Sequence, residues 1–427
     1  MSDPIFALAS AKGRAGISVI RLSGDGALPI AEALAGGDRK PLPVEGRSLR
    51  DLTHAGEIID RTLIVTFAEG RSFTGEAVVE FHCHGSSAVV QAVLTALSAH
   101  ARLAEPGEFT RRALENEELD LAQVEGLADL IEAETEAQRK IALRVMQGGL
   151  SEKVAEWRKD LIRAVSLIEA TIDFADEDVP TDVSPEVLAL VGGVQEALLT
   201  EIKGSFAAER IREGFEVAIV GPPNIGKSTL LNALAGREAA ITSEVAGTTR
   251  DVIEVRMDIG GLAVTLLDTA GIRETEDQVE AIGVDRAKAR AANADLRVFL
   301  TEGGSPELEP QDGDIVAIGK ADDYQGDAFA VSGKMGKGID RLIGQISETL
   351  EARASMAETA TRARHRAGME GALPHLAYAQ EHARDEALAE IVAAELKEAI
   401  FKLSSLIGAV GVEDILDEIF ASFCLGK

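Results

Sequence analysis

Residues 215–228 decide the fold of the middle of the chain: they read Phe215-Glu-Val-Ala-Ile-Val220, then Gly221-Pro-Pro-Asn-Ile-Gly-Lys227-Ser228. The first part is a short apolar run that ends at a glycine, which is typical of a buried parallel strand. The second part fits G-x-x-x-x-G-K-[ST], the phosphate-binding loop that joins a strand to a helix. A helical pattern follows directly, so this stretch predicts a nucleotide-binding α/β domain.

The residue types in this loop explain how it would bind phosphate. The glycines let backbone N–H groups surround a phosphate group, and the following helix directs its positive N-terminus at the anion. We expect Lys227 to reach the β- and γ-phosphates and the Ser228 hydroxyl to bind Mg²⁺. Asn224, Ile225, Gly226 and Thr229 complete the predicted loop.

Apolar runs like the one at 215–220 recur farther along the chain. They cover Leu262–Leu267, Leu296–Leu300, Ile315–Ile318 and Ala328–Val331, and helix-like stretches separate most of them. Strands that alternate with helices predict a doubly wound parallel sheet. We place the end of this domain near residue 350.

Two further segments have the composition of nucleotide switches. Asp268-Thr-Ala-Gly271 follows a predicted strand, where the carboxylate can support Mg²⁺ and the backbone N–H of Gly271 can contact a γ-phosphate. Gly247-Thr-Thr-Arg-Asp251 lies between this segment and the phosphate loop, and a threonine hydroxyl there can complete the Mg²⁺ coordination. Three elements in this order are far more specific than any one alone.

The predicted base-binding segments depart from the usual pattern at two glycines. GTPases commonly read guanine with Asn-Lys-x-Asp, and this chain has Gly319-Lys-Ala-Asp322 at the end of a predicted strand. Val331-Ser-Gly-Lys334 fits the next base loop, with Gly333 where alanine is commoner. Lys320, Asp322 and Ser332 still favour guanine over adenine, with a plain ATPase as the alternative.

The residue that follows Asp-Thr-Ala-Gly is Ile272, although Ras-like GTPases place a water-positioning glutamine there. An isoleucine cannot orient water, so we expect Glu280, farther along the chain, to take that role. A cation beside the phosphates could replace an arginine finger. The side-chain carbonyl of Asn224 is suited to binding K⁺.

The segments that flank the α/β unit have different periodicities. From Ile5 to about Thr110, β-like runs such as Ile17–Leu22 and Thr62–Phe67 alternate with glycine-rich turns. Helical spacing follows, with one stripe at Leu121, Val124, Leu127 and Ile131 and a second at Val154, Trp157, Leu161, Val165, Ile168 and Ile172. Helical periodicity returns after about residue 350, so we expect either one helical domain that contains the α/β unit as an insertion or two separate helical pieces. Trp157 is expected in a core.

Composition limits the cellular setting and the partners. The chain has 427 residues, 43 Lys and Arg against 72 Asp and Glu, a formal net charge of −29 and two cysteines, Cys83 and Cys424. Two cysteines cannot build a disulfide framework, so we expect a cytoplasmic protein. We read neither a signal peptide nor a membrane-spanning segment. Such acidity repels phosphate backbones, so any nucleic acid must be held by a local basic patch or by a partner.

His82-Cys-His84 invites a metal interpretation because His82 and His84 share one face of a predicted strand. Three neighbouring donors with no distant fourth are weak for zinc, and we predict no metal there.

Seven motifs together carry a family resemblance. Three belong to the nucleotide-binding unit: Gly221–Thr229, Leu231-Asn-Ala-Leu-Ala-Gly-Arg-Glu-Ala-Ala-Ile241, and Gly247–Asp251 with Asp268-Thr-Ala-Gly-Ile-Arg273. Four lie outside it: Ser72-Phe-Thr-Gly-Glu76, Pro106-Gly-Glu-Phe109, Leu119-Asp-Leu-Ala-Gln-Val-Glu125 and Phe423-Cys-Leu-Gly-Lys427. The first three fit several translation-linked GTPases, but the whole set resembles the MnmE (TrmE) family of tRNA uridine 5-carboxymethylaminomethyl modification GTPases over essentially the full chain.

The resemblance implies a three-domain architecture. An N-terminal α+β domain, residues 1–117, would bind folate and form a homodimer. A helical domain, residues 118–213 and 352–427, would contain the inserted Ras-like doubly wound P-loop G domain, residues 214–351. The family hydrolyses GTP with K⁺ stimulation. With the flavoprotein MnmG, it installs a carboxymethylaminomethyl group at C5 of the wobble uridine of certain tRNAs, using 5-formyl- or 5,10-methylenetetrahydrofolate. The tRNA would be bound mainly by MnmG.

The resemblance also assigns roles to particular residues of this sequence. Asn224, Ser243, Val245 and Thr248 match the K⁺ site, Ser228 and Thr249 the Mg²⁺ site, and Glu280 the glutamate that positions the attacking water. Arg21, Glu80 and Lys427 match folate contacts, and Cys424 matches a cysteine near the folate site. Glu118 departs from the family's usual lysine. The predicted GTP-binding residues are Asn224, Ile225, Gly226, Lys227, Ser228, Thr229, Ser243, Glu244, Val245, Ala246, Gly247, Thr248, Thr249, Asp268, Thr269, Ala270, Gly271, Lys320, Asp322 and Ser332.

Two other functions remain open from the sequence. The first is a ribosome-assembly or RNA-linked switch GTPase without folate chemistry. The second is a degenerate G protein that acts as a scaffold, which Gly319 would suit.

Overall fold

The computed structural model describes residues 2–36, 40–173, 182–237, 254–268, 292–306, 309–408 and 426. The chain forms two compact units, Met1–Ala128 with Ile407–Lys427, and Asp129–Leu406. We describe each unit by itself.

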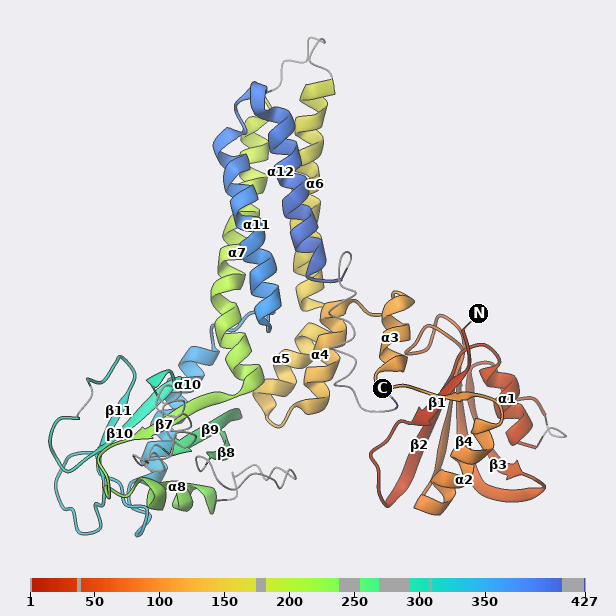
Figure 1. Ribbon diagram of the computed structural model, residues 1–427, viewed down its shortest axis with the longest axis horizontal. Coiled ribbons are helices and arrows are strands. Elements are labelled where there is room, and N and C mark those ends of the chain that lie inside the picture. The colour runs from red at the N-terminus through yellow and green to blue at the C-terminus, as the bar shows by residue number, and fades with distance from the viewer. Residues whose placement is uncertain are drawn as a thin grey trace, which may run out of the picture. The chain divides into compact units, whose positions relative to one another are not determined.

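The first unit is built on a six-stranded sheet with the strand order β3-β4-β5-β2-β1-β6 (Figure 1). All neighbouring strands are antiparallel except β1 and β6, which are parallel. Its strands are β1 (Ile5–Leu8), β2 (Ala15–Ser23), β3 (Gly46–His54), β4 (Glu57–Phe67), β5 (Val78–Gly85) and β6 (Arg102–Leu103). Its helices are α1 (Ala27–Leu34), α2 (Ser87–Ser98), α3 (Glu108–Glu115) and the start of α4 (Leu121–Glu132).

The two faces of this sheet differ in chemistry because side chains alternate along each strand. Ile20 and Leu22 of β2 and Phe81 of β5 are fully buried in a core that also contains residues of α1 and α2. Arg21, between Ile20 and Leu22, and Glu80, next to Phe81, are paired residues of β2 and β5 and project to the opposite face. The alternation that makes the core therefore also places these two charged residues together.

The second unit contains a bundle of four long helices that lie side by side in Figure 1. They are α6 (Gly149–Asp173), α7 (Ser184–Glu213), α11 (Ala363–His382) and α12 (Ala389–Ser405), with η2 (Glu386–Leu388) before the last and α5 (Glu136–Met146) before the first. Trp157 is 6% exposed, which confirms its predicted place in a core. The stripe at Leu121, Val124, Leu127 and Ile131 lies on α4 as predicted, and Ile131, near its end, is 40% exposed because the buried residues of α4 lie in its first turns.

A buried glutamate ties the bundle to the segment that leads into it. Glu201 of α7 is 2% exposed and accepts hydrogen bonds at 2.7 Å from the backbone N–H groups of Thr359 and Ala360 and from the Thr359 hydroxyl. Lys153 of α6 donates to the other carboxylate oxygen at 2.5 Å. Both oxygens of this carboxylate are thus used to join α6 and α7 to the segment that precedes α11.

The α/β part of this unit has a five-stranded sheet with the order β11-β10-β7-β9-β8. Its strands are β7 (Phe215–Val220), β8 (Glu254–Ile259), β9 (Leu262–Asp268), β10 (Leu296–Thr301) and β11 (Ile315–Ile318). Its core includes Leu230, Leu231 and Leu234 of α8 (Lys227–Ala235) and Ile339, Leu342, Ile346 and Leu350 of α10 (Ile339–Ala354). The predicted doubly wound α/β class is confirmed.

Two details of this sheet differ from the sequence prediction. The run 328–331 is not a strand: Ala330 makes only an isolated bridge to Ile318. Strand β8 was not predicted, and it pairs antiparallel with β9. Its sequence, Glu-Val-Arg-Met-Asp-Ile, alternates charged and apolar residues as an edge strand does, so a search for continuous apolar runs passes over it.

Within the described parts of the chain, no helix has the length and apolar character needed to cross a membrane.

Candidate functional site

The predicted phosphate loop lies at the carboxyl end of the parallel strands. Strand β7 ends at Val220 and α8 begins at Lys227, with the loop between them. Ile219 of β7 pairs with Asp268 of β9, so the second predicted element ends at the same edge of the sheet. Ligands of open α/β sheets bind outside this edge, so both predicted elements end where such a ligand would bind.

Side chains of the two elements are already in contact. The Ser228 hydroxyl donates to Oδ2 of Asp268 at 2.7 Å. Lys227 is 5% exposed, and its ammonium donates to the carbonyl oxygens of Gly221 and Pro222 at 2.6 and 2.9 Å. Asn224 is exposed and has φ +62, a left-handed conformation that asparagine tolerates. The hydroxyl oxygen of Ser228 and the carboxylate oxygens of Asp268 are ligand atoms of the kind that Mg²⁺ prefers.

The two predicted base loops are joined by hydrogen bonds from both backbone and side chains. The Ser332 hydroxyl is hydrogen-bonded to Oδ1 of Asp322 and accepts from the N–H of Met335 at 3.0 Å. The backbone N–H of Ala321 donates to the Val331 carbonyl at 3.1 Å. Ser332 therefore holds the carboxylate that we predict to read the base.

The structure places these loops beside the phosphate loop. A cavity of about 170 Å³ is lined by the phosphate loop and by the two base loops. Its lining residues include Gly226, Gly319, Lys320, Asp322, Ser332 and Gly333. Three of the predicted elements, the phosphate loop and the two base loops, thus converge on one hollow.

The remaining predicted nucleotide residues lie outside the described part of the chain. They are Ser243, Glu244, Val245, Ala246, Gly247, Thr248, Thr249, Thr269, Ala270, Gly271 and Glu280. Lys427 and Cys424 of the predicted folate site also lie outside it.

Arg21 and Glu80, the other predicted folate residues, form a close pair in the first unit. The guanidinium donates to Oε1 of Glu80 through Nε at 3.0 Å and through a terminal nitrogen at 2.9 Å. The two side chains are 19% and 16% exposed, and β2 and β5 are inner strands, so neither residue is a solvated edge charge.

Two aromatic rings flank this pair, and the sequence analysis did not assign them a role. The guanidinium carbon of Arg21 lies 5.4 Å from the ring centre of Phe73 and 5.6 Å from that of Phe109. Phe73 belongs to the motif Ser72–Glu76 and Phe109 to the motif Pro106–Phe109. Membership of these two motifs is the sequence feature that could have pointed to both phenylalanines. A half-buried charge pair beside two aromatic rings suits a flat heterocycle with polar edges.

A second charged network, centred on Arg112 and Glu76, contacts β2 through the hydroxyl of Ser23. Arg112 is 8% exposed and donates to both carboxylate oxygens of Glu76 at 3.2 and 3.1 Å, and to Glu108 at 3.2 Å. Burial disfavours ionisation of Glu108, but hydrogen bonds from Arg102, Arg112 and the backbone of Glu105 outweigh it and lower the pKa of this carboxyl. Glu118 lies against the motif of Glu76, since a Cβ on Gly75 would come within 3.0 Å of its Cγ.

His82 and His84 each face a carboxylate. His84 shares a 2.8 Å contact between Nδ1 and Asp60, and His82 lies 3.4 Å from Glu80. Burial raises the pKa of Cys83, between them, to about 11. Among the described residues, no three histidine, cysteine, aspartate or glutamate side chains are close enough together to hold a metal ion.

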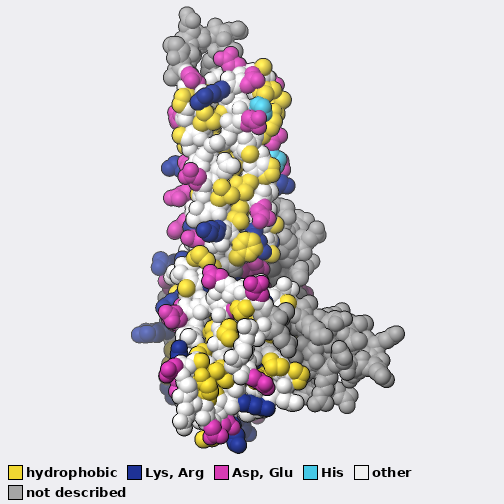
Figure 2. All heavy atoms as spheres, turned by 90° about the vertical axis from the view of Figure 1, so that its left-hand side faces the viewer, with side chains coloured by type: hydrophobic (Ala, Val, Ile, Leu, Met, Phe, Trp, Pro, Cys, Tyr) yellow, Lys and Arg dark blue, Asp and Glu magenta, His cyan; other side chains and the backbone are white. Residues whose placement is uncertain are grey.

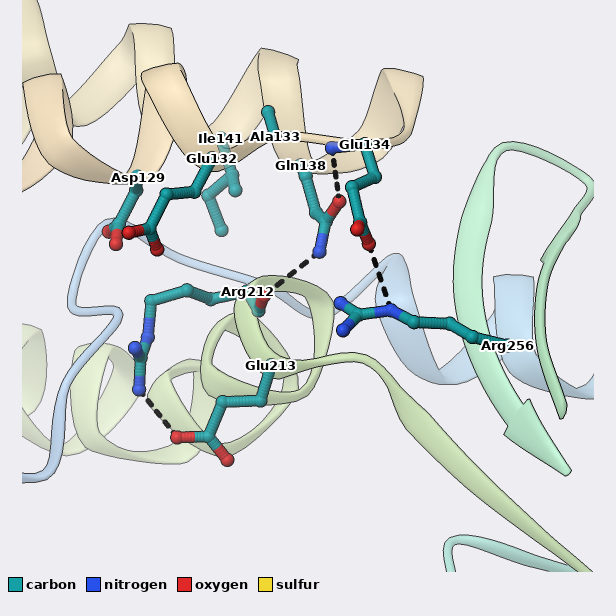
Figure 3. A pocket seen from close by; sticks show the side chains of 9 residues that line it. All are labelled: Asp129, Glu132, Ala133, Glu134, Gln138, Ile141, Arg212, Glu213 and Arg256. Carbon is teal, nitrogen blue, oxygen red and sulfur yellow. Dashed lines mark hydrogen bonds and ion pairs between the residues drawn. The ribbon is translucent and has the colours of Figure 1, made fainter. Parts of the chain in front are cut away.

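Figure 3 shows a cavity of about 440 Å³ at the junction of the α/β part with the helices of the same unit. Arg256 of β8 pairs with Glu134 at 2.8 Å, and the amide of Gln138 donates to the carbonyl of Arg212 at 3.0 Å. The N–H of Ala137 donates to the carbonyl of Gly261 at 3.0 Å, in the turn between β8 and β9. The sheet edge at β8 is therefore attached to the α4–α5 turn. Sequence reasoning missed this attachment.

On the face that Figure 2 shows, the described lysine and arginine side chains are scattered singly among carboxylates. This distribution does not make a basic surface for a nucleic acid there.

Comparisons with known proteins cover the whole chain. Residues 4–118 match the family described as "GTP-binding protein TrmE N-terminus", and residues 121–424 match the "MnmE helical domain". The tRNA modification GTPase MnmE of Dinoroseobacter shibae is 55% identical over 100% of both chains. That of Ruegeria pomeroyi is 58% identical, also over 100% of both. Among solved structures, an Era variant from Aquifex aeolicus bound to GDP·AlF4⁻ is 30% identical, covering 32% of this chain and 56% of that chain with a TM-score of 0.26.

Full-length identity above one half, together with matches to both family domains, decides the family. The chain belongs to the MnmE family of tRNA modification GTPases.

Proposed function

We propose that this chain is a K⁺-dependent GTP hydrolase that works with an MnmG flavoprotein to install a carboxymethylaminomethyl group at C5 of the wobble uridine of certain tRNAs. A tetrahydrofolate derivative supplies the one-carbon unit. The observation that carries the proposal is the contact between Ser228 and Asp268 beneath the phosphate loop of a chain that belongs to this family.

On the nucleotide side, the residues divide the work by their chemistry. Backbone N–H groups of the loop and Lys227 bind the phosphates, while Ser228 and Asp268 hold Mg²⁺. Mg²⁺, when bound, neutralises charge that develops on the phosphate oxygens. We assign Asn224, with its exposed amide, to K⁺ together with Ser243, Val245 and Thr248, and we assign Thr249 to Mg²⁺ and Glu280 to the attacking water.

On the folate side, Arg21 and Glu80 provide a cation and an anion at one place. A pterin ring has N–H donors that a carboxylate accepts and carbonyl groups that a guanidinium binds. The half-buried ring of Phe73 beside Arg21 provides an apolar wall for a flat ring, and the fully buried ring of Phe109 packs near the guanidinium from the core. Lys427 completes our assignment of this site.

The charge balance supports a division of labour between partners. A chain with a net charge of −29 binds RNA poorly by itself, so we assign most of the tRNA contact to MnmG. The homodimer, the cytoplasmic location and the domain limits 1–117, 118–213 with 352–427, and 214–351 are part of the same proposal.

The test measures GTP turnover by the purified protein in K⁺ and in Na⁺. We expect faster turnover in K⁺, and Asn224→Ala should remove the difference between the two salts. Equal rates for the unaltered protein would contradict the cation mechanism.

A second experiment separates this function from a switch GTPase without folate chemistry. The unaltered protein should bind 5-formyltetrahydrofolate in a calorimetric titration, and Arg21→Ala should bind it weakly or not at all. Wobble nucleosides from a strain that lacks the gene should lose the carboxymethylaminomethyl group. Retention of the modification would refute the assigned reaction.

A further inference from the structure

The two departures from the usual base-binding motifs are both glycines, of which Gly319 lies against the phosphate loop and Gly333 against the first turn of α8. Gly319 stands where asparagine is usual, and Gly333 stands where alanine is usual. A glycine in place of asparagine removes a side-chain amide, so the sequence suggests only the loss of one contact to the nucleotide. In the structure, both glycines also lie too close to neighbouring backbone for a side chain to fit.

The backbone at Gly319 lies very close to the phosphate loop. A Cβ added there would lie 2.8 Å from the carbonyl oxygen of Ile225 and 2.9 Å from its Cγ1. Real Cβ atoms essentially never come so close, and the first of these neighbours is backbone. Ile225 is itself 2% exposed, so it has little space into which to move.

Gly333 makes the same kind of approach to the start of α8. A Cβ there would lie 2.6 Å from the backbone nitrogen of Leu230 and 2.6 Å from the carbonyl oxygen of Thr229. All of these neighbours belong to the first turn of α8, which begins with Lys227 and Ser228.

The base loops are held in this position by their own hydrogen bonds. The N–H of Gly319 donates to Thr301 at 2.9 Å, and the N–H of Val331 donates to Ile318 at 2.8 Å. Each loop is thus tied to the sheet close to its glycine. A side chain at either glycine would therefore be accommodated mainly by displacement of the phosphate loop or of α8.

We propose that Gly319 and Gly333 set the distance between the base loops and the phosphate loop, and so determine nucleotide affinity as positioning residues. The inference rests on the proposed binding of guanine nucleotides at this site. In this arrangement Asp322, oriented by Ser332, reads the base without the amide of an asparagine. Restoring the usual asparagine must then weaken binding rather than strengthen it.

The test compares GDP binding by Gly319→Ala, Gly319→Asn and Gly333→Ala with that of the unaltered protein. Matched controls are Gly344→Ala and Gly344→Asn, because Gly344 lies on the exposed side of α10 with no atom within 4 Å of an added Cβ. The readouts are titration of a fluorescent GDP analogue in K⁺ and Mg²⁺ and the melting temperature without nucleotide.

We expect both Gly319 variants and Gly333→Ala to bind GDP at least roughly tenfold more weakly, with Gly319→Asn no better than Gly319→Ala. All of these variants should keep a cooperative melting transition without nucleotide, and the GDP affinity of the Gly344 variants should be unchanged. Tighter binding by Gly319→Asn would overturn the inference, because the glycine would then be only a lost contact. Unchanged affinity would also overturn it, and so would failure of Gly319→Ala to fold, since the role assigned here is in binding. Failure of the unaltered protein to bind GDP would instead refute the proposed function.

Discussion

The hydroxyl of Ser228 and the Oδ2 atom of Asp268 are 2.7 Å apart, although the two residues are 40 positions apart in the sequence. Parallel pairing of β7 with β9 produces this meeting, because it brings the carboxyl ends of both strands to one edge. The contact joins a hydroxyl that can bind Mg²⁺ directly to a carboxylate that supports it.

The first prediction concerns this pair. Asp268→Asn keeps the shape of the side chain and removes its charge, so Mg²⁺ should be held less well and GTP turnover should fall roughly 100-fold, or about 2.7 kcal/mol. Turnover measured against Mg²⁺ concentration checks this. Asp258→Asn, near the end of β8, is the matched control and should retain turnover. An Asp268→Asn enzyme with normal Mg²⁺ dependence would argue against the assignment.

The second prediction concerns the pair Arg21 and Glu80. Arg21→Ala leaves the half-buried carboxylate of Glu80 without its two guanidinium hydrogen bonds and removes the cation from the folate site. Charge-assisted bonds of this kind contribute about 1.5–3 kcal/mol, so folate affinity should fall roughly 10- to 100-fold. Calorimetric titration with 5-formyltetrahydrofolate measures the change.

Arg61→Ala is a suitable control for this titration, since Arg61 is exposed on the same sheet and lies 3.8 Å from Asp51. Its folate affinity should equal that of the unaltered protein. A similar loss in both variants would show that general charge, rather than the pair at Glu80, governs the binding.

The third prediction concerns Cys83, which is 1% exposed. Burial is the main cause that raises the pKa of this thiol to about 11, with a smaller contribution from the charge of Asp60. At about pH 8 only ~0.1% of the thiol is then the reactive thiolate. Iodoacetamide should leave Cys83 unmodified in the native protein and modify it in concentrated guanidinium chloride, as peptide mass spectrometry would show. Rapid labelling of the native protein would place Cys83 outside the core.

The sequence predicted the parts of the fold that depend on local pattern. Ile315–Ile318 is a strand with the predicted bounds, and the stripe that contains Trp157 is buried from Val154 to Ile168. The interactions that sequence reasoning missed depend on long-range packing. Glu201 meets Thr359 across 158 positions, and no spacing rule connects them. Likewise, the sequence marks Gly319 as a missing amide, while only the structure reveals the backbone of Ile225 beside it.

The last prediction concerns the stability of the bundle and its dependence on pH. Burial disfavours the charge of Glu201, but hydrogen bonds from Lys153, Thr359 and Ala360 outweigh that effect and lower its pKa below the ordinary value of 4.5. A carboxyl whose folded pKa is depressed contributes stability that is fully present above its unfolded pKa. That contribution is lost as the pH falls through the lower, folded pKa.

Glu201→Gln removes the charge while it keeps the size of the side chain. It leaves the ammonium of Lys153 without this partner, and it turns one acceptor oxygen into a donor that faces other donors. We expect a loss of about 3 kcal/mol near pH 7. At roughly 2–4 °C per kcal/mol for a unit of this size, the melting temperature should fall by about 6–12 °C.

The pH dependence separates this charge from simple packing. The melting temperatures of the unaltered protein and of Glu201→Gln should converge as the pH is lowered below about 4.5, because the unaltered carboxyl becomes protonated and loses the same interactions. Glu196→Gln, an exposed position on the same helix, should match the unaltered protein at every pH. A difference between Glu201→Gln and the unaltered protein that stays constant from pH 7 down to acid unfolding would mean that shape, rather than charge, fastens α11 to α7.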